Sequence, residues 1–221
     1  MADTTICIQA PQPAAQLILV FHGVGSNPQS MQPLGAHLAE KFPRALVACV
    51  QSPDPSFVPG GFEWFSVAGI TEEGRQARVD AAMAGFSHCI AEWQRVAGVG
   101  PEATALVGFS QGAIMALEST KLASPPASRV VAIAGRFANL PVTGDYTGTI
   151  HFLHGKEDPV IPYQHTVMAA HHLRDLGVDM TAEVLPFIPH AVPQDFIDMA
   201  AEKLANHISH KVWKDAMVPG Q

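Results

Sequence analysis

Short apolar runs alternate with longer helical patterns along most of the chain. The runs are nearly continuous in apolar residues, which is typical of strands buried on both faces of a sheet. A repeated strand–helix–strand order favours right-handed crossovers and a mainly parallel sheet with helices on both faces. The sequence therefore predicts an α/β fold. The expected strands are 5–9, 16–21, 45–50, 103–109, 129–134, 149–153 and 181–185, and the expected helices are 30–42, 72–97, 111–123, 163–176 and 193–213.

Two segments depart from this pattern. Residues 5–9 are more polar and alternate, which indicates an antiparallel strand at the edge of the sheet. Residues 51–69 are rich in proline and glycine and are expected to form a long irregular loop. Such loops are often functional, but aromatic side chains can also simply hold a loop on the surface. Both alternatives stay open for the aromatics of this loop, which are Phe57, Phe62, Trp64 and Phe65.

Composition limits the class of protein. The 221 residues are 48% hydrophobic and only 15% charged, which suits a folded core and excludes a disordered chain. The net charge of −7 argues against a nucleic-acid partner. No repeat or linker divides the chain, so a single domain over residues 1–221 is expected. The sequence gives no oligomeric state.

The cysteines and the apolar runs bear on localisation. Cys7, Cys49 and Cys89 are far apart and form no disulfide framework, which suits a reducing compartment. Residues 1–6 lack the pattern of a signal peptide. The longest apolar runs, such as 17–21, are far shorter than the roughly 20 residues that cross a bilayer. We therefore expect a cytoplasmic protein without stable membrane insertion.

The segment Gly108-Phe109-Ser110-Gln111-Gly112 has the G-x-S-x-G spacing of a nucleophile elbow and stands where a strand should give way to a helix. Side chains two positions before and after the serine would collide across so sharp a turn, and glycine removes both Cβ atoms. The alternative is a glycine-rich turn in which the serine only caps the helix. The spacing favours Ser110 as a nucleophile at the carboxyl edge of the sheet.

A serine nucleophile needs a base, and in α/β-hydrolases the acid and the histidine follow the serine along the chain. Among the late histidines, His190 alone lies in a short turn between a strand and a helix, which predicts a place at the same edge. Asp158 follows the expected strand 149–153 and is the predicted acid, with Glu157 as the nearest rival and Asp145 as a poorer one. A local turn formed by the aspartate is the alternative for Asp158.

An oxyanion hole needs backbone N–H groups aimed at the developing negative charge. One donor is expected from Gln111, which follows the nucleophile at the positive end of its helix. The other is expected from Val24, in the glycine-containing junction after the strand 16–21. His22 in this junction is interpreted as a structural histidine that hydrogen-bonds within its loop.

These motifs together resemble the phospholipase/carboxylesterase family of the α/β-hydrolases, which includes acyl-protein thioesterases and small bacterial carboxylesterases. The resemblance rests, in chain order, on HGVG at 22–25, WF at 64–65, GFSQG at 108–112, HGKEDPVIP at 154–162 and His190. It implies an α/β-hydrolase fold, a triad of Ser110, Asp158 and His190, and oxyanion donors at Val24 and Gln111. Ser26-Asn27 and Pro189 depart from residues that relatives often carry, and they bear on the shape of the site.

The leading hypothesis is a serine esterase that cleaves small or acyl carboxylic esters, or thioesters, through an acyl-enzyme. A non-catalytic ligand-binding protein on the same fold and a peptidase are the alternatives. Trp64, Phe65 and Arg136 are weaker candidates for substrate contact, and a structural salt bridge is favoured for Arg136. No cofactor pattern is present, and no metal is expected, because no carboxylate or cysteine completes a ligand set at His171-His172 or at His207 and His210.

Overall fold

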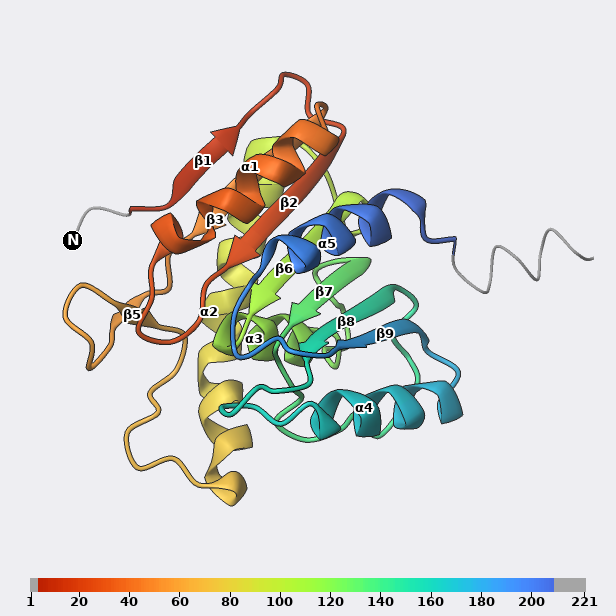
Figure 1. Ribbon diagram of the computed structural model, residues 1–221. Helices are drawn as coiled ribbons and strands as arrows, with labels where there is room; N and C mark the ends of the chain where they lie inside the picture. The colour runs from red at the N-terminus through yellow and green to blue at the C-terminus, as the bar shows by residue number, and fades with distance from the viewer. Residues whose placement is uncertain (1–3, 209–221) are drawn as a thin grey trace, which may run out of the picture.

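The computed structural model describes residues 4–208, and its centre is a seven-stranded sheet with the order β1-β3-β2-β6-β7-β8-β9. Every neighbouring pair is parallel except β1 and β3, which are antiparallel at one edge (Figure 1). The predicted mainly parallel sheet and its antiparallel edge strand are both confirmed. The strands are β1 (Ile6–Gln9), β2 (Gln16–Phe21), β3 (Ala45–Val50), β6 (Thr104–Phe109), β7 (Arg129–Ile133), β8 (Thr149–Gly155) and β9 (Asp179–Leu185).

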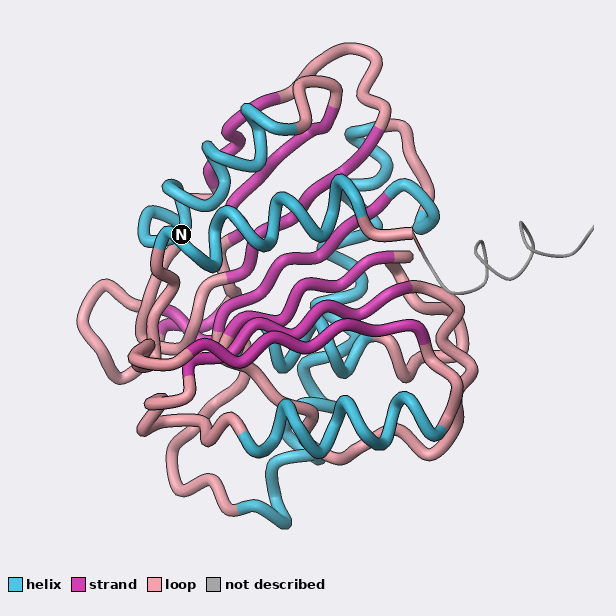
Figure 2. Tube along the Cα trace, turned by 45° about the vertical axis from the view of Figure 1, so that its right-hand side comes forward, coloured by secondary structure: helices cyan, strands magenta, loops and turns pink. Residues whose placement is uncertain are grey.

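Helices cover both faces of this sheet, as Figures 1 and 2 show. On one face, α1 and α5 pack on alternate residues of the strands, including Ile18, Val107 and Val131. On the other face, α2, α3 and α4 pack on the residues between them, such as Leu19 and Leu106. Burial on both faces explains why the strands read as continuous apolar runs. The helices are α1 (Gln32–Lys41), α2 (Glu72–Ala97), α3 (Gln111–Ser119), α4 (Gln164–Asp175) and α5 (Gln194–Asn206).

Several helix ends differ from the predicted ones for local reasons. The helix expected at 30–42 is a 3-10 turn, Pro28–Met31, followed by α1, whose first turn holds Pro33. The helix expected at 111–123 ends at Ser119, where the hydroxyls of Ser119 and Thr120 donate back to carbonyls of the preceding turn. The last helix ends at Asn206, and residues 209–213 of the prediction lie outside the described residues.

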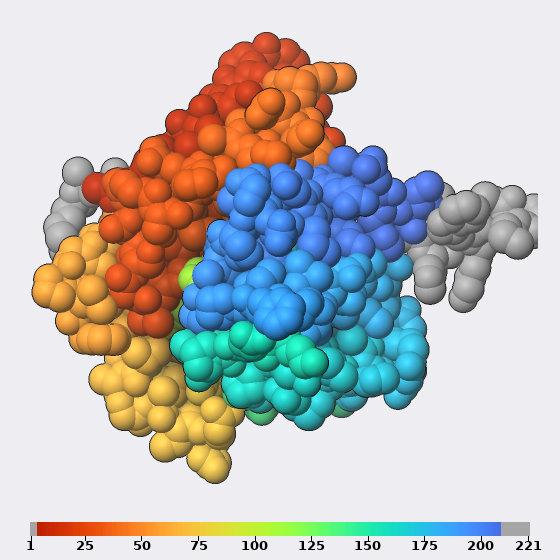
Figure 3. Space-filling model, viewed as in Figure 1, coloured from red at the N-terminus to blue at the C-terminus, as the bar shows by residue number. Residues whose placement is uncertain are grey.

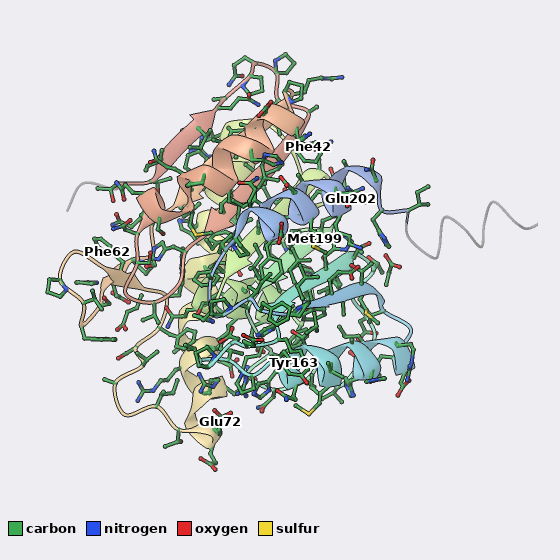
Figure 4. The ribbon with its side chains drawn as sticks, viewed as in Figure 1. Phe42, Phe62, Glu72, Tyr163, Met199 and Glu202 are labelled. Atoms are coloured by element: carbon green, nitrogen blue, oxygen red, sulfur yellow. The ribbon has the colours of Figure 1, made fainter. Side chains whose placement is uncertain are left out.

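The segment 51–69 is less irregular than expected. It contains a small antiparallel pair, β4 (Asp54–Pro55) with β5 (Phe62–Glu63), and Phe62 also bridges to Ser26. Figure 4 labels Phe62 on this hairpin, at the side of the molecule away from α4. The hairpin therefore ties the loop to the junction after β2. Between residues 4 and 208, no helix has the length and apolar character that a membrane span requires.

Candidate active site

Ser110 lies in the sharp turn between β6 and α3 with φ of 53° and ψ of −116°, a conformation that side-chain-bearing residues rarely adopt. A Cβ on Gly108 would lie 2.4 Å from the backbone nitrogen of Ala113, which is the expected collision across the turn. A Cβ on Gly112 would instead lie 2.5 Å from the carbonyl oxygen of Phe21 in β2. The second glycine is therefore needed to let α3 approach the neighbouring strand, while a Cβ on Gly108 would also lie 2.5 Å from the carbonyl carbon of Gly112.

The structure brings Ser110, His190 and Asp158 into one hydrogen-bonded chain. The Oγ of Ser110 is 2.9 Å from Nε2 of His190, and Nδ1 of His190 is 2.7 Å from Oδ2 of Asp158. A carboxylate only accepts, so Nδ1 carries the proton and Nε2 accepts from the serine hydroxyl. The rival Asp145 bonds to Thr143 instead, and Glu157 has an exposed side chain. The arrangement has the geometry that a serine nucleophile and its base require.

Asp158 is held as a carboxylate at the end of β8. Burial raises its pKa, but hydrogen bonds from His190 and from the backbone N–H groups of Ile161 and Val160 outweigh burial, so the pKa lies below its ordinary value. The backbone contacts are made to Oδ1, at 2.8 Å from Val160 and 2.9 Å from Ile161. The local turn that the sequence offered as an alternative therefore coexists with the contact to His190, because the two use different oxygens.

The two predicted oxyanion donors have free backbone N–H groups. Gln111 is the first residue of α3, where N–H groups have no partner within the helix, and no acceptor among residues 4–208 is found for Val24. His22 fixes the orientation of the peptide group between Gly23 and Val24, because its Nδ1–H donates to the Gly23 carbonyl at 2.7 Å. Its Nε2 accepts from the backbone N–H of Ser52 at 3.2 Å, and burial lowers the pKa of His22. A neutral, fully bonded His22 thus fixes the orientation of this loop.

The side chain of Gln111 has a role that the sequence did not indicate. Its amide oxygen accepts from the backbone N–H of Trp64 at 2.8 Å, and its amide nitrogen donates to the carbonyl of Phe65 at 2.7 Å. The indole N–H of Trp64 donates to the carbonyl of His22 at 2.9 Å. Gln111 and Trp64 therefore join the 51–69 segment to the junction after β2, residues 22–25, which is called the oxyanion junction because it contains the predicted donor Val24. In Figure 3 the middle of the chain is almost hidden between the first and last thirds of the sequence.

Trp64 and Phe65 are both buried, each with 4% of its surface exposed. The ring of Trp64 meets Phe21 and Phe86 edge to face. Trp64 also lines a groove of about 580 Å³ between the 51–69 segment and α2, but Ser110 and His190 do not contribute to its lining. The observed contacts of Trp64 are therefore with core aromatics and with His22, and the carbonyl of Phe65 accepts from Gln111.

Arg136, which follows β7, pairs with Glu72 at the start of α2, with an Nη2–Oε2 distance of 2.7 Å. Figure 4 labels Glu72 at this end of the helix. Hydrogen bonds from Arg75 and then Arg136 lower the pKa of Glu72 to about 2. The Glu72 side chain is 61% exposed, so solvent weakens the pair and its effect on stability is small.

Two of the histidines considered for a metal site bond to other groups of the protein. The Nε2 of His172 lies 2.7 Å from the carbonyl of Pro141, and the Nε2 of His207 lies 2.9 Å from a carboxylate oxygen of Asp179. His210 lies outside the described residues. Within the described part of the chain, no three His, Cys, Asp or Glu side chains gather in a way that could hold a metal ion.

The chain is similar to known esterases. A family model described as phospholipase/carboxylesterase matches residues 2–208. Esterase YpfH from Escherichia coli (strain K12) is 46% identical over 215 residues, which make up 97% of this chain and 93% of that protein. The crystal structure of esterase PE8 superposes with a TM-score of 0.83 at 26% identity, over 93% of this chain and 98% of that one.

A plant relative has the same fold at a lower sequence identity. Acyl-protein thioesterase 2 of Zea mays superposes with a TM-score of 0.69 at 22% identity and covers 91% of this chain and 97% of its own. At that identity the likeness concerns the fold alone. The predicted architecture and the predicted resemblance to this family are confirmed. Because the family model spans nearly the whole sequence, the chain belongs to the phospholipase/carboxylesterase family of α/β-hydrolases.

Proposed function

We propose that this protein is a serine carboxylesterase with Ser110 as nucleophile, His190 as general base and acid, and Asp158 as the residue that orients His190. The observation that carries the proposal is the unbroken hydrogen-bonded chain from Ser110 through His190 to Asp158. Membership of a carboxylesterase family and the names of the esterases that it resembles support the same reaction class.

The reaction follows from the positions of the protons. The Oγ of Ser110 attacks the ester carbonyl carbon while its proton passes to Nε2 of His190, and the backbone N–H groups of Val24 and Gln111 bind the oxyanion. The intermediate collapses, the C–O bond to the leaving group breaks, and His190 returns the proton to the departing alcohol. Water then attacks the acyl-enzyme, His190 takes a proton from the water and delivers it to Ser110, and the carboxylic acid leaves.

The substrate class proposed is a small-molecule or acyl carboxylic ester, with thioesters as a second class because a thioester carbonyl undergoes the same attack. A purely ligand-binding role is less favoured, because all three groups are present and hydrogen-bonded. A peptidase is less favoured because the family is named for phospholipases and carboxylesterases.

For the weaker substrate candidates we propose supporting roles. Trp64 holds the oxyanion junction through its indole hydrogen bond to His22. The backbone groups of Trp64 and Phe65 hold the side chain of Gln111. Arg136 joins the loop after β7 to α2 through Glu72.

We also propose that the chain acts as a single domain in the cytoplasm, without a nucleic-acid partner or a cofactor. Burial raises the pKa of Cys49 to about 12, so this thiol is inert. A negatively charged protein whose cysteine spacing predicts no disulfide framework suits a reducing compartment and has no general attraction for nucleic acid.

The nucleophile is tested with a fluorophosphonate probe and with p-nitrophenyl acetate. We expect wild type to be labelled and to turn over the ester, and Ser110→Ala to do neither. Ser119→Ala is the matched control, because Ser119 is a buried serine at the other end of α3 whose hydroxyl donates to the carbonyl of Ala116 in its own helix. Equal labelling of wild type and Ser110→Ala would refute the proposed nucleophile.

A further inference from the structure

A second histidine touches the carboxylate of Asp158. His154 lies near the end of β8 with none of its surface exposed. Its Nε2 is 3.3 Å from Oδ2 of Asp158 and 2.8 Å from the carbonyl oxygen of Ile161. Its Nδ1 is 2.8 Å from the hydroxyl of Thr166 in α4. Both ring nitrogens are therefore occupied, and the same carboxylate oxygen faces His154 and His190.

The hydrogen positions on His154 follow from its partners. The carbonyl of Ile161 only accepts, so Nε2 carries a proton that it donates to this carbonyl, and the same N–H group lies beside Asp158, with Nε2 3.3 Å from Oδ2. Burial lowers the pKa of His154, against the opposing effect of Ile161 and Asp158, and the ring is neutral at pH 7. In a neutral ring Nδ1 is the acceptor, so the hydroxyl of Thr166 donates to it. The carbonyl of Ile161 thus fixes the tautomer of His154, and the hydroxyl of Thr166 holds the ring through Nδ1.

These contacts close a ring around the carboxylate. Ile161 donates its backbone N–H to Oδ1 of Asp158 and gives its carbonyl oxygen to Nε2 of His154. Oδ1 also accepts from Val160, so one carboxylate oxygen is held entirely by the loop. The other oxygen is left to the two histidines. Rotation of the carboxylate away from His190 would break the contacts of both oxygens.

We propose that His154 is a positioning residue for the reaction of Ser110, which holds the Asp158 carboxylate in the rotation that points Oδ2 at His190 and, through Thr166, couples this rotation to α4. The inference rests on the proposed function of the Ser110 site. His154 itself touches neither Ser110 nor the substrate carbonyl in this scheme. Its effect on the rate arises entirely through the orientation of Asp158 and His190.

Two substitutions of His154 separate the hydrogen bond from the volume of the ring. His154→Leu removes both nitrogens, whereas His154→Gln retains an N–H donor at about the distance of Nε2 from the backbone. For p-nitrophenyl acetate we expect kcat of His154→Leu to fall by about tenfold with KM little changed, because a poorly held base acts on the bound substrate. We expect His154→Gln to recover most of this loss.

The same strand offers a matched control. His151 of β8 is also buried, with 1% exposed, and its Nδ1 is 2.9 Å from the hydroxyl of Thr181, but it has no contact with the Ser110 site. His151→Leu therefore measures the effect of removing a buried histidine and its threonine partner from β8. We expect its kcat to stay within about twofold of wild type.

A third variant covers the case in which His154→Leu does not fold. Thr166→Val leaves the ring of His154 in place and removes the hydroxyl that holds its Nδ1. We expect a smaller fall in kcat in the same direction, with Thr181→Val unchanged as its control. The low-field proton NMR line of the His190–Asp158 hydrogen bond should broaden or shift in Thr166→Val and not in Thr181→Val.

The outcomes separate the two proposals. If His154→Leu keeps kcat within about twofold of wild type, or if Thr166→Val and Thr181→Val behave alike in both rate and NMR line, the positioning role of His154 is wrong. If Ser110→Ala remains as active as wild type, the proposed function is wrong, whatever the His154 variants do. A fall in kcat for His154→Leu that His154→Gln reverses, with His151→Leu unaffected, supports the positioning role.

Discussion

Acidification should destabilise this protein because it buries neutral histidines, and His151 allows the effect to be calculated. Burial is the main cause that lowers the pKa of His151 to about 3 from an ordinary value of 6.5. The nearby positive groups His207, Lys203 and Arg129 lower the pKa further, and Asp179 opposes them. One ring nitrogen, Nε2, has no hydrogen-bond partner among the described residues.

The sign follows from comparing the folded and unfolded chains. The pKa of His151 is lower in the folded protein, so between pH 6.5 and pH 3 the unfolded chain binds a proton that the folded chain does not. The stability contributed by the neutral ring is complete above pH 6.5 and is lost as the pH falls below it. Integrating the difference in bound protons from pH 7 to pH 5 gives a loss of about 2 kcal/mol from this one residue.

Urea denaturation of wild type and His151→Leu at pH 7, 6 and 5 measures this loss. With an m-value of about 2–3 kcal/mol/M for a chain of this size, the wild-type midpoint should fall by about 0.7–1 M more than that of the variant. The absolute stability of the variant does not matter, because only the difference in pH dependence is compared. Parallel loss of stability in the two proteins would refute the buried, neutral state of His151.

The remaining predictions concern the elbow and its neighbour. Gly112→Ala should lower the rate of fluorophosphonate labelling by at least about tenfold, because its Cβ would lie 2.5 Å from the carbonyl oxygen of Phe21. The control Gly85→Ala in α2, where the added Cβ meets no atom within 4 Å, should label like wild type. Equal labelling of the two variants would show that the turn at Ser110 tolerates the added Cβ. Gln111→Ala should lower the free energy of unfolding in urea by about 3 kcal/mol, because a buried N–H and a buried carbonyl lose their partners. The control Gln194→Ala, whose partner Asp198 is exposed, should change it by less than about 0.5 kcal/mol, and a similar loss in both would contradict the reasoning.

The sheet and the three reacting side chains could be predicted from the sequence because each follows from position along the chain. Parallel strands buried on both faces leave a continuous apolar pattern, and their carboxyl ends meet at one edge. Ser110, Asp158 and His190 each follow a different strand of the sheet, so their meeting required no knowledge of side-chain directions. The glycines two positions before and after Ser110 likewise predicted the sharp turn in which Ser110 has its positive φ.

The supporting contacts could not be predicted because they depend on which way a side chain points. Gln111 was expected to act through its backbone, and nothing in its spacing indicates that its amide pairs with Trp64 and Phe65. The close approach of Gly112 to Phe21 could not be predicted, because this contact arises from packing between elements. His154 was read as part of a family motif, and its contact with Asp158 follows only from the fold of the loop after β8.

Contacts at the two ring nitrogens explain why only one histidine of the site suits proton transfer. In His22 and His154 both nitrogens are bound, one as donor to a backbone carbonyl and the other as acceptor from a backbone N–H or a hydroxyl. Neither has a lone pair for a new proton unless an existing hydrogen bond breaks in a buried place, which is costly. His190 donates to Asp158 through Nδ1, and its Nε2 faces only the hydroxyl of Ser110. In the proposed mechanism, His22 and His154 are therefore fixed, neutral supports for the oxyanion junction and for Asp158, and His190 carries the proton.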